Sequence, residues 1–137
     1  MQRISIQARK VVTDAITASE ITGISADNVI QGYRPQGIDP ATLSVSIFIN
    51  DSNRVNVQTG NAAIIHEVDY AIYGDKVSTV TAKMSELLTA LEGYNDDHTL
   101  MQCTLTSTQV EVETDGVTGV INSRWFEMSG VESELPI

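Results

Sequence analysis

The feature that most constrains the fold of this chain is a change of hydrophobic period between residues 61 and 93. Up to Tyr73 the residues alternate with a period of two, as in a strand with one buried face, whose inward set is His66, Val68, Tyr70 and Ile72. Apolar residues then recur at steps of three and four, which predicts an amphipathic helix with the stripe Val77, Val80, Met84, Leu87, Leu88 and Leu91. The sequence therefore predicts a strand over 62–73 that leads directly into a helix over 75–91.

The ends and the outer face of this helix can also be predicted. Asp75 is placed to accept helix N–H groups as an N-cap, and Gly93 stands where a C-terminal glycine is common. Glu86 and Glu92 lie off the apolar stripe. We therefore expect their removal to change the free energy of unfolding by no more than about 0.5 kcal/mol.

The N-terminal part of the chain predicts a second helix and two strands. An apolar stripe indicates a helix over 4–19, formed by Ile4, Ala8, Val11, Val12, Ala15 and Ile16. A short strand over 28–33 ends at Arg34-Pro35, because proline donates no hydrogen bond to a sheet. Alternation over 42–50 predicts a longer strand.

Three more strands are predicted after the second helix, over 100–106, 108–113 and 120–128. Their pattern places Met101, Cys103, Leu105, Val110 and Val112 inward, and Asp115-Gly116 is a hairpin signal between the last two strands. Strands joined by turns pair antiparallel, and two apolar helix stripes need a surface to bury them. The sequence thus predicts an α+β fold, a single two-layer domain over 1–137 with a mainly antiparallel sheet packed against two helices.

Two polar segments are predicted to lie outside this sheet. Residues 50–61 are too long and too polar for a tight hairpin, so we interpret them as a protruding loop or a flexible hairpin tip between two strands. Residues 130–137 are interpreted as an extended C-terminal tail. The polar side chains of these segments are the candidate contacts with other subunits or partners: Asn50, Asp51, Asn53, Arg54, Asn56, Glu132 and Glu134.

The net charge of −10 is unevenly divided along the chain. Residues 1–85 carry eight acids against seven bases, whereas residues 86–137 carry ten acids and one base, Arg124. This imbalance argues against tight binding to nucleic acid, which needs basic patches that displace counterions. It is compatible with a solubility surface, and equally with a surface past which nucleic acid moves without being held.

No group of residues in the sequence predicts catalysis, a cofactor or a metal. His66, Glu67 and Asp69 are close in sequence, but alternation puts His66 on the face opposite the two acids. The acidic turn with Asp96, Asp97 and His98 lacks the ligand spacing of a calcium loop. No phosphate-binding loop or nucleophile elbow occurs. We therefore expect a protein that is not an enzyme.

The sequence also favours a protein of a reducing compartment with no membrane segment. Cys103 is the single cysteine, so an internal disulfide is impossible. No apolar run approaches the roughly 20 residues that span a bilayer, and the polar N-terminus lacks a signal peptide. Trp125 and Phe126 are adjacent in a strand and must point to opposite faces. One of them is expected against a helix, the other against a loop or a neighbouring subunit.

The order of these elements resembles that of the tail terminator (tail completion) proteins of long-tailed bacteriophages. That family begins with an amphipathic helix and a short strand and continues with an exposed strand, a long strand, a helix and a final antiparallel pair. The matching segments here are 9–16, 28–34, 43–50, 67–74, 76–91 and 113–117. The most suggestive piece is the strand that leads through Tyr-Gly-Asp-Lys at 73–76 into a helix ending in Leu87-Leu88-x-x-Leu91. The resemblance is one of layout and covers nearly the whole chain.

The resemblance implies a structural virion protein, made in the host cytoplasm. It implies a homo-oligomeric ring, hexameric in this family, that caps the tail tube and joins it to the head. Its partners would be the tail tube protein and a head-completion or connector protein, and DNA would pass through the ring unbound. Two alternatives stay open: another head–tail connector or head-completion protein of the neck, and, from a different class, a dimeric cellular ligand-binding or enzymatic α+β domain.

Overall fold

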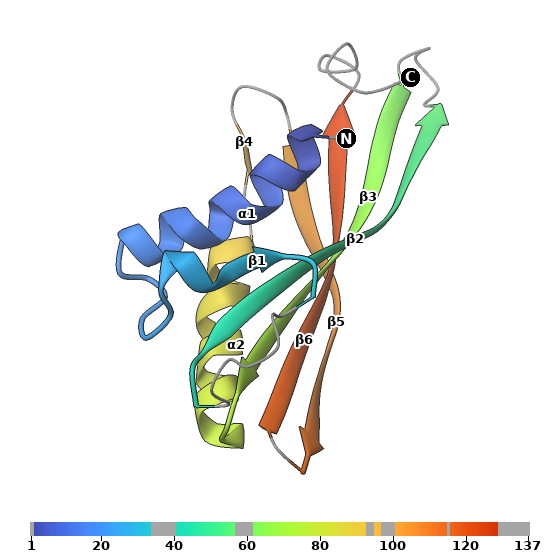
Figure 1. The fold of residues 1–137 in the computed structure, drawn as a ribbon. Coiled ribbons are helices and arrows are strands. Elements are labelled where there is room, and N and C mark those ends of the chain that lie inside the picture. The colour runs from blue at the N-terminus through green and yellow to red at the C-terminus, as the bar shows by residue number, and fades with distance from the viewer. Residues whose placement is uncertain are drawn as a thin grey trace.

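The computed structural model describes residues 2–33, 41–56, 62–92, 95–96, 101–114 and 116–128. Two helices pack on one side of a strongly twisted sheet (Figure 1). The helices are α1 (Gln2–Thr17) and α2 (Val77–Leu91), and a short 3-10 helix, η1, covers Ala26–Asn28. The strands are β1 (Val29–Gln31), β2 (Ser44–Asn56), β3 (Ala62–Gly74), β4 (Asn95–Asp96), β5 (Met101–Glu113) and β6 (Gly116–Met128).

The strands form one sheet in the order β1-β2-β3-β6-β5-β4. β1 runs parallel to β2, and every other neighbouring pair is antiparallel. The sheet consists mainly of four long strands, β2, β3, β6 and β5. Strand β3 leads directly into α2. The prediction of one α+β domain with a mainly antiparallel sheet against two helices is confirmed.

The core lies between the helices and the sheet face that they cover. Both helical stripes are largely buried, through Ile4, Ala8, Val11, Val12 and Ala15 of α1 and Val80, Met84, Leu87 and Leu91 of α2, but Val77 of the predicted α2 stripe is 47% exposed. The Tyr70 hydroxyl donates a 2.9 Å hydrogen bond to the Ala8 carbonyl, so β3 and α1 are tied together inside the core. Full burial of each large side chain contributes roughly 1.5–3 kcal/mol.

Helix α2 crosses β6 at close range. This close approach is possible because β6 has a glycine at the crossing. A Cβ atom at Gly119 would lie 2.8 Å from Cγ1 of Val80 and would also clash with Met84. A Cβ at Gly74 would lie 2.8 Å from Cγ2 of Val80 and 2.9 Å from Leu43. Val80 therefore sits in a hollow that two glycines of neighbouring strands leave open, which fixes the position of α2 over β3 and β6.

Three details differ from the prediction. Residues 50–56 belong to β2 rather than to a loop, and the rest of the predicted loop, 57–61, lies outside the described residues. The two strands predicted over 100–113 form the single strand β5, because a register shift between Leu105 and Ser107 reverses the alternation without ending the strand. The N-cap of α2 is Lys76, with no side-chain cap bond, rather than Asp75. Gly93 is outside the described residues.

Replacing Gly119 by alanine tests the close packing of α2. The added methyl group meets Val80, whose branched side chain has little rotamer freedom in a helix. We expect Gly119→Ala to lower the free energy of unfolding by about 1–3 kcal/mol. Denaturant melts measure this change, and the exposed Gln109→Ala on β5 should stay within about 0.5 kcal/mol of the parent. Equal losses in the two variants would contradict the packing described here.

Candidate assembly surfaces

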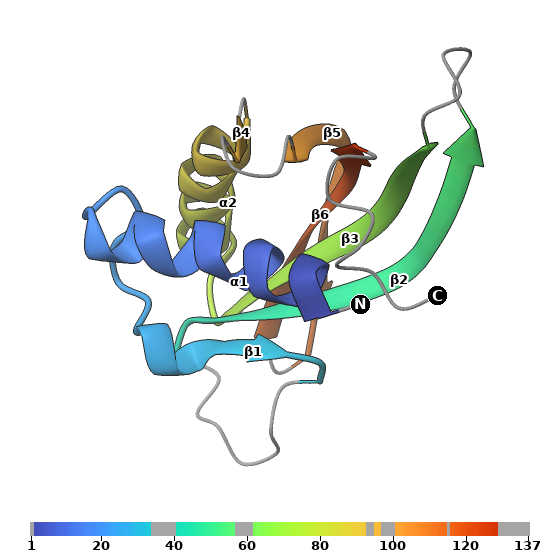
Figure 2. The same ribbon diagram turned by 90° about the horizontal axis from the view of Figure 1, so that it is seen from above.

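Within the part of the chain that the structure describes, the helices cover only one face of the sheet, and the other face carries no helix (Figure 2). Polar side chains on that face pair across neighbouring strands: Asn50 donates to Asp69, Arg124 pairs with Glu67 at 3.4 Å, and Asn122 donates to Ser107 at 2.7 Å. The rings of Tyr33 and Phe48 meet edge to face there, with centroids 5.3 Å apart. This mixed surface is typical of a sheet face that contacts other proteins or water rather than a second core layer.

Trp125 and Phe126 occupy the two faces as predicted. Trp125 is fully buried on the helix side. Phe126 is half-buried on the face without helices. The residues next to Phe126 along the chain, from 127 onward, have no described side chains, so the choice between a loop and a neighbouring subunit stays a prediction.

The outer edge of β5 is largely unpaired within the described part of the chain. β4 pairs with β5 only at Met101 and Gln102, which leaves 107–113 as a sheet edge. Val110 and Val112 were predicted to point inward, and the expectation that they are therefore buried is wrong. Both lie on the helix-bearing face, since they pair with Gly119 and Val117 of β6, yet they are 41% and 69% exposed. Unpaired edges of this kind are where sheets add strands from other chains.

The predicted contact residues Asn50, Asp51 and Asn53 lie on β2, where it leaves the body of the domain alongside β3 (Figures 1 and 2). The pairing shifts by one residue between Ile49 and Asp51, and Asn50 at this bulge donates to Asp69. Asp51 accepts from the Ser52 amide at 2.9 Å and from Asn53 at 2.8 Å. These side chains are exposed but held by local bonds.

The remaining predicted contacts are less fully defined. The backbones of Arg54 and Asn56 pair with Ile64 and Ala62 of β3. Glu132 and Glu134 lie outside the described residues. That these residues, with Asn50, Asp51 and Asn53, contact another subunit or partner stays a prediction.

His66 is fully buried on the helix side of β3, and it is bound to a serine. Its Nδ1 lies 2.6 Å from the Ser52 hydroxyl. Glu67 is exposed and Asp69 half-buried on the opposite face, as alternation predicted. Among the described residues, no group of three or more His, Cys, Asp or Glu is arranged to hold a metal ion. The sequence predicted that His66 faces inward but gave no sign of its partner, because the polar segment with Ser52 was interpreted as a loop.

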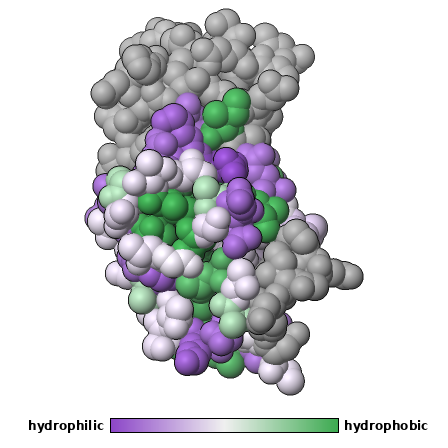
Figure 3. All heavy atoms as spheres, turned by 60° about the vertical axis from the view of Figure 1, so that its left-hand side comes forward, coloured by the Kyte–Doolittle hydropathy of each residue, from purple (hydrophilic) through white to green (hydrophobic). Residues whose placement is uncertain are grey.

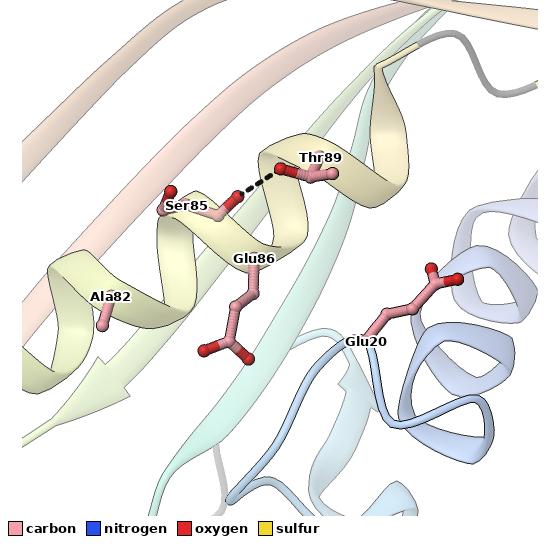
Figure 4. Close-up of a pocket in the computed structure, with 5 residues that line it drawn as sticks. All are labelled: Glu20, Ala82, Ser85, Glu86 and Thr89. Atoms are coloured by element: carbon pink, nitrogen blue, oxygen red, sulfur yellow. Dashed lines mark hydrogen bonds between the residues drawn. The ribbon is translucent and has the colours of Figure 1, made fainter.

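A groove of about 720 Å³ lies beside α2, and Figure 4 shows the residues that line it: Glu20, Ala82, Ser85, Glu86 and Thr89. A smaller hollow of about 230 Å³ continues between α1 and Ala90. On this side of the molecule apolar residues gather in the middle and polar residues surround them (Figure 3). The dashed bond in Figure 4 joins the Thr89 hydroxyl to the Ser85 carbonyl within the helix.

Glu86 forms structural contacts in this groove that the sequence did not predict. It accepts from the Thr22 amide at 2.9 Å and from Lys83 at 3.0 Å, and Lys83 also donates to the Thr22 hydroxyl. Burial alone would raise the pKa of Glu86, but these hydrogen bonds and the charge of Lys83 hold it below its ordinary value. The expectation that Glu86 contributes little to folding is therefore revised: it ties the segment after α1 to α2.

The pKa of Glu86 leads to a pH-dependent prediction. Because its folded-state pKa is lowered, the stabilisation is complete above the ordinary pKa and is lost as pH falls through the folded value. We expect Glu86→Gln to cost about 1 kcal/mol at pH 7, since the side chain is mostly covered and bonds as an ion. The gap between parent and variant should close in acid.

Urea melts at pH 7 and pH 3 measure this effect, with Glu92→Gln as the matched control at the end of the same helix. Glu92 is exposed, and its substitution should change the free energy of unfolding by less than about 0.5 kcal/mol at either pH. A Glu86→Gln deficit that persists unchanged at pH 3 would show that it arises from altered packing rather than from the ionised carboxylate.

No helix among the described residues combines the length and apolar character that a bilayer crossing requires.

Comparisons with known proteins give a likeness to solved structures. Neither a protein-family model nor a curated protein matches this sequence. Among solved structures, the fold is similar to that of a chain described as "Virion of native gene transfer agent (GTA) particle". The TM-score is 0.60 at 16% sequence identity, and the match covers 75% of this chain and 80% of that chain. At this identity, the comparison establishes a shared fold.

Proposed function

We propose that this protein is a structural component of a phage-like virion. Within that class we propose a tail terminator, which forms a homohexameric ring, caps the tail tube and joins it to the head. The observation that carries the proposal is the fold shared with a chain of a gene transfer agent virion over three-quarters of this chain. The order of elements in the sequence supports the finer role independently, through its resemblance to tail terminators.

The surfaces of the domain suit a protein that acts by assembly. A sheet face without helices, an unpaired edge on β5 and a projecting β2–β3 pair give one subunit several different contact surfaces. Rings form when two different surfaces of identical subunits meet head to tail and the rotation closes. The large groove beside α2 is lined by Thr89, whose hydroxyl bonds the Ser85 carbonyl, and by Glu86, which is held by Lys83. These observations favour a structural role over an enzymatic one.

A first test is the mass of the assembled protein, alone and with tail tubes. Light scattering should give a particle of six 14.9 kDa chains, and electron microscopy should show a ring. Added to growing tubes of the matching tail tube protein, the ring should bind one end and stop elongation. Binding to head particles but not to tubes would favour another neck protein. A stable dimer that binds neither would favour the cellular α+β domain.

The acidic surplus gives a second test. The exposed Glu111 and Glu113 belong to the half of the chain that carries ten acids and one base. Acidic surfaces gain nothing from counterion release on DNA, so the assembled protein should not retain duplex DNA even at low salt. Filter retention of labelled duplex measures this, with a basic DNA-binding protein as the positive control. Salt-sensitive retention would contradict a passage through which DNA moves unbound.

A further inference from the structure

Apart from Val77 at the start of α2, the exposed large apolar side chains of the described chain fall into two groups at opposite sides of the sheet. One group, Val110 and Val112, lies on β5. The other, Ile6 and Tyr33, lies at the β1 side, on α1 and just after β1. Figure 2 shows these two sides far apart, with β2, β3 and β6 between β1 and β5. The sequence patterns did not predict that either group would lie on the surface.

The β5 group combines apolar and acidic side chains on a sheet edge that, at 107–113, pairs with no other described strand. Val110 and Val112 are 41% and 69% exposed on the helix side of the strand. Glu111 and Glu113 alternate with them and are exposed on the other side. No basic side chain is found on the described part of this strand. The edge therefore presents two valines flanked by uncompensated negative charge.

The β1 group combines apolar and basic side chains around a groove of about 310 Å³ between α1 and β1. Its lining is Ile6, Arg9, Lys10, Thr13 and Gln31. Ile6 is 59% exposed. Arg9 donates to the carbonyls of Val29 and Ala26, so its bonds leave its positive charge unneutralised. Lys10 pairs with Asp14, but both side chains are more than half exposed, and such pairs contribute little.

We propose that the β5 edge of one subunit docks in the α1–β1 groove of a second copy of this chain. The valines pack on Ile6, and Glu111 and Glu113 lie near Arg9 and Lys10. This inference rests on the proposed ring and specifies its repeating contact. Two copies of the β5 edge are poor partners for each other, because their acids would repel. The two surfaces differ and lie on opposite sides, so the contact is head to tail and suits ring closure.

Cysteine cross-linking tests the contact directly. In a Cys103→Ser background, which removes the single native cysteine, Ile6→Cys and Val112→Cys are introduced together. Both positions are exposed, so folding should tolerate them. Mild oxidation of the assembled protein should give a ladder on a denaturing gel, from dimer up to the closed ring. Each single variant should yield no ladder, and the pair Ile6→Cys with Thr81→Cys, on the exposed side of α2, serves as the matched control.

The outcomes separate this contact from the proposed function. Rings without a ladder in the Ile6–Val112 pair would overturn the contact and leave the ring standing. Strong dimer formation by Val112→Cys alone would also overturn it, because the β5 edges would then meet each other. Absence of both ring and ladder, with and without tail tubes, would reject the contact and the proposed function together.

Charge exchange provides a second, independent readout. Lys10→Glu and Glu113→Lys should each weaken subunit association about tenfold, because each sets like charges against each other. The double variant should recover parental association, since the opposite charges are restored with exchanged positions. Glu92→Lys, an exposed acid at the end of α2, is the control and should leave association unchanged. Thermal melts establish that each variant is folded. Additive losses in the double variant would contradict the pairing of these two sites.

Discussion

The close approach of α2 to the sheet determines most of the remaining structure. Val80 enters a hollow left by Gly74 and Gly119, so the helix is fixed over β3 and β6. A helix in that position buries Met84, Leu87 and Leu91 but leaves the far edge of β5 uncovered. The position of α2 therefore both completes the core and leaves exposed the β5 edge on which the proposed assembly depends.

The sequence predicted the parts of the fold that depend on a regular period. Both helices, the strand β3 and the hairpin that pairs Glu113 with Gly116 follow from alternation, from three-and-four spacing and from turn residues. The errors arose where one extra residue interrupts a strand. Register shifts near Asn50 and between Leu105 and Ser107 reverse the alternation, so a continuous strand resembles a strand followed by a loop or by a second strand.

The candidate surfaces were harder to predict, because exposure depends on which neighbour covers a face. Val110 and Val112 alternate as buried residues do, yet they are 41% and 69% exposed. Glu86 has the pattern of a solvated residue, yet a bond across 64 positions to Thr22 gives it a structural role. Contacts between residues this far apart in the sequence cannot be predicted from the spacing of neighbouring residues. No motif in the sequence indicates chemistry, and the functional hypothesis came from the order of elements, to which the comparison adds similarity of fold to a virion chain.

The two edges of this sheet differ, and the proposed function depends on that difference. β1 is short, and the Val29 carbonyl on it accepts from Arg9, whereas β5 is long and its outer edge is mostly unpaired in the described chain. A sheet with two equivalent open edges tends to add copies without limit. One open, acidic edge and one partly closed, basic groove instead define a direction of addition. Directional addition with a fixed rotation stops when the last subunit meets the first, and this limited assembly is what a ring at the end of a tube requires.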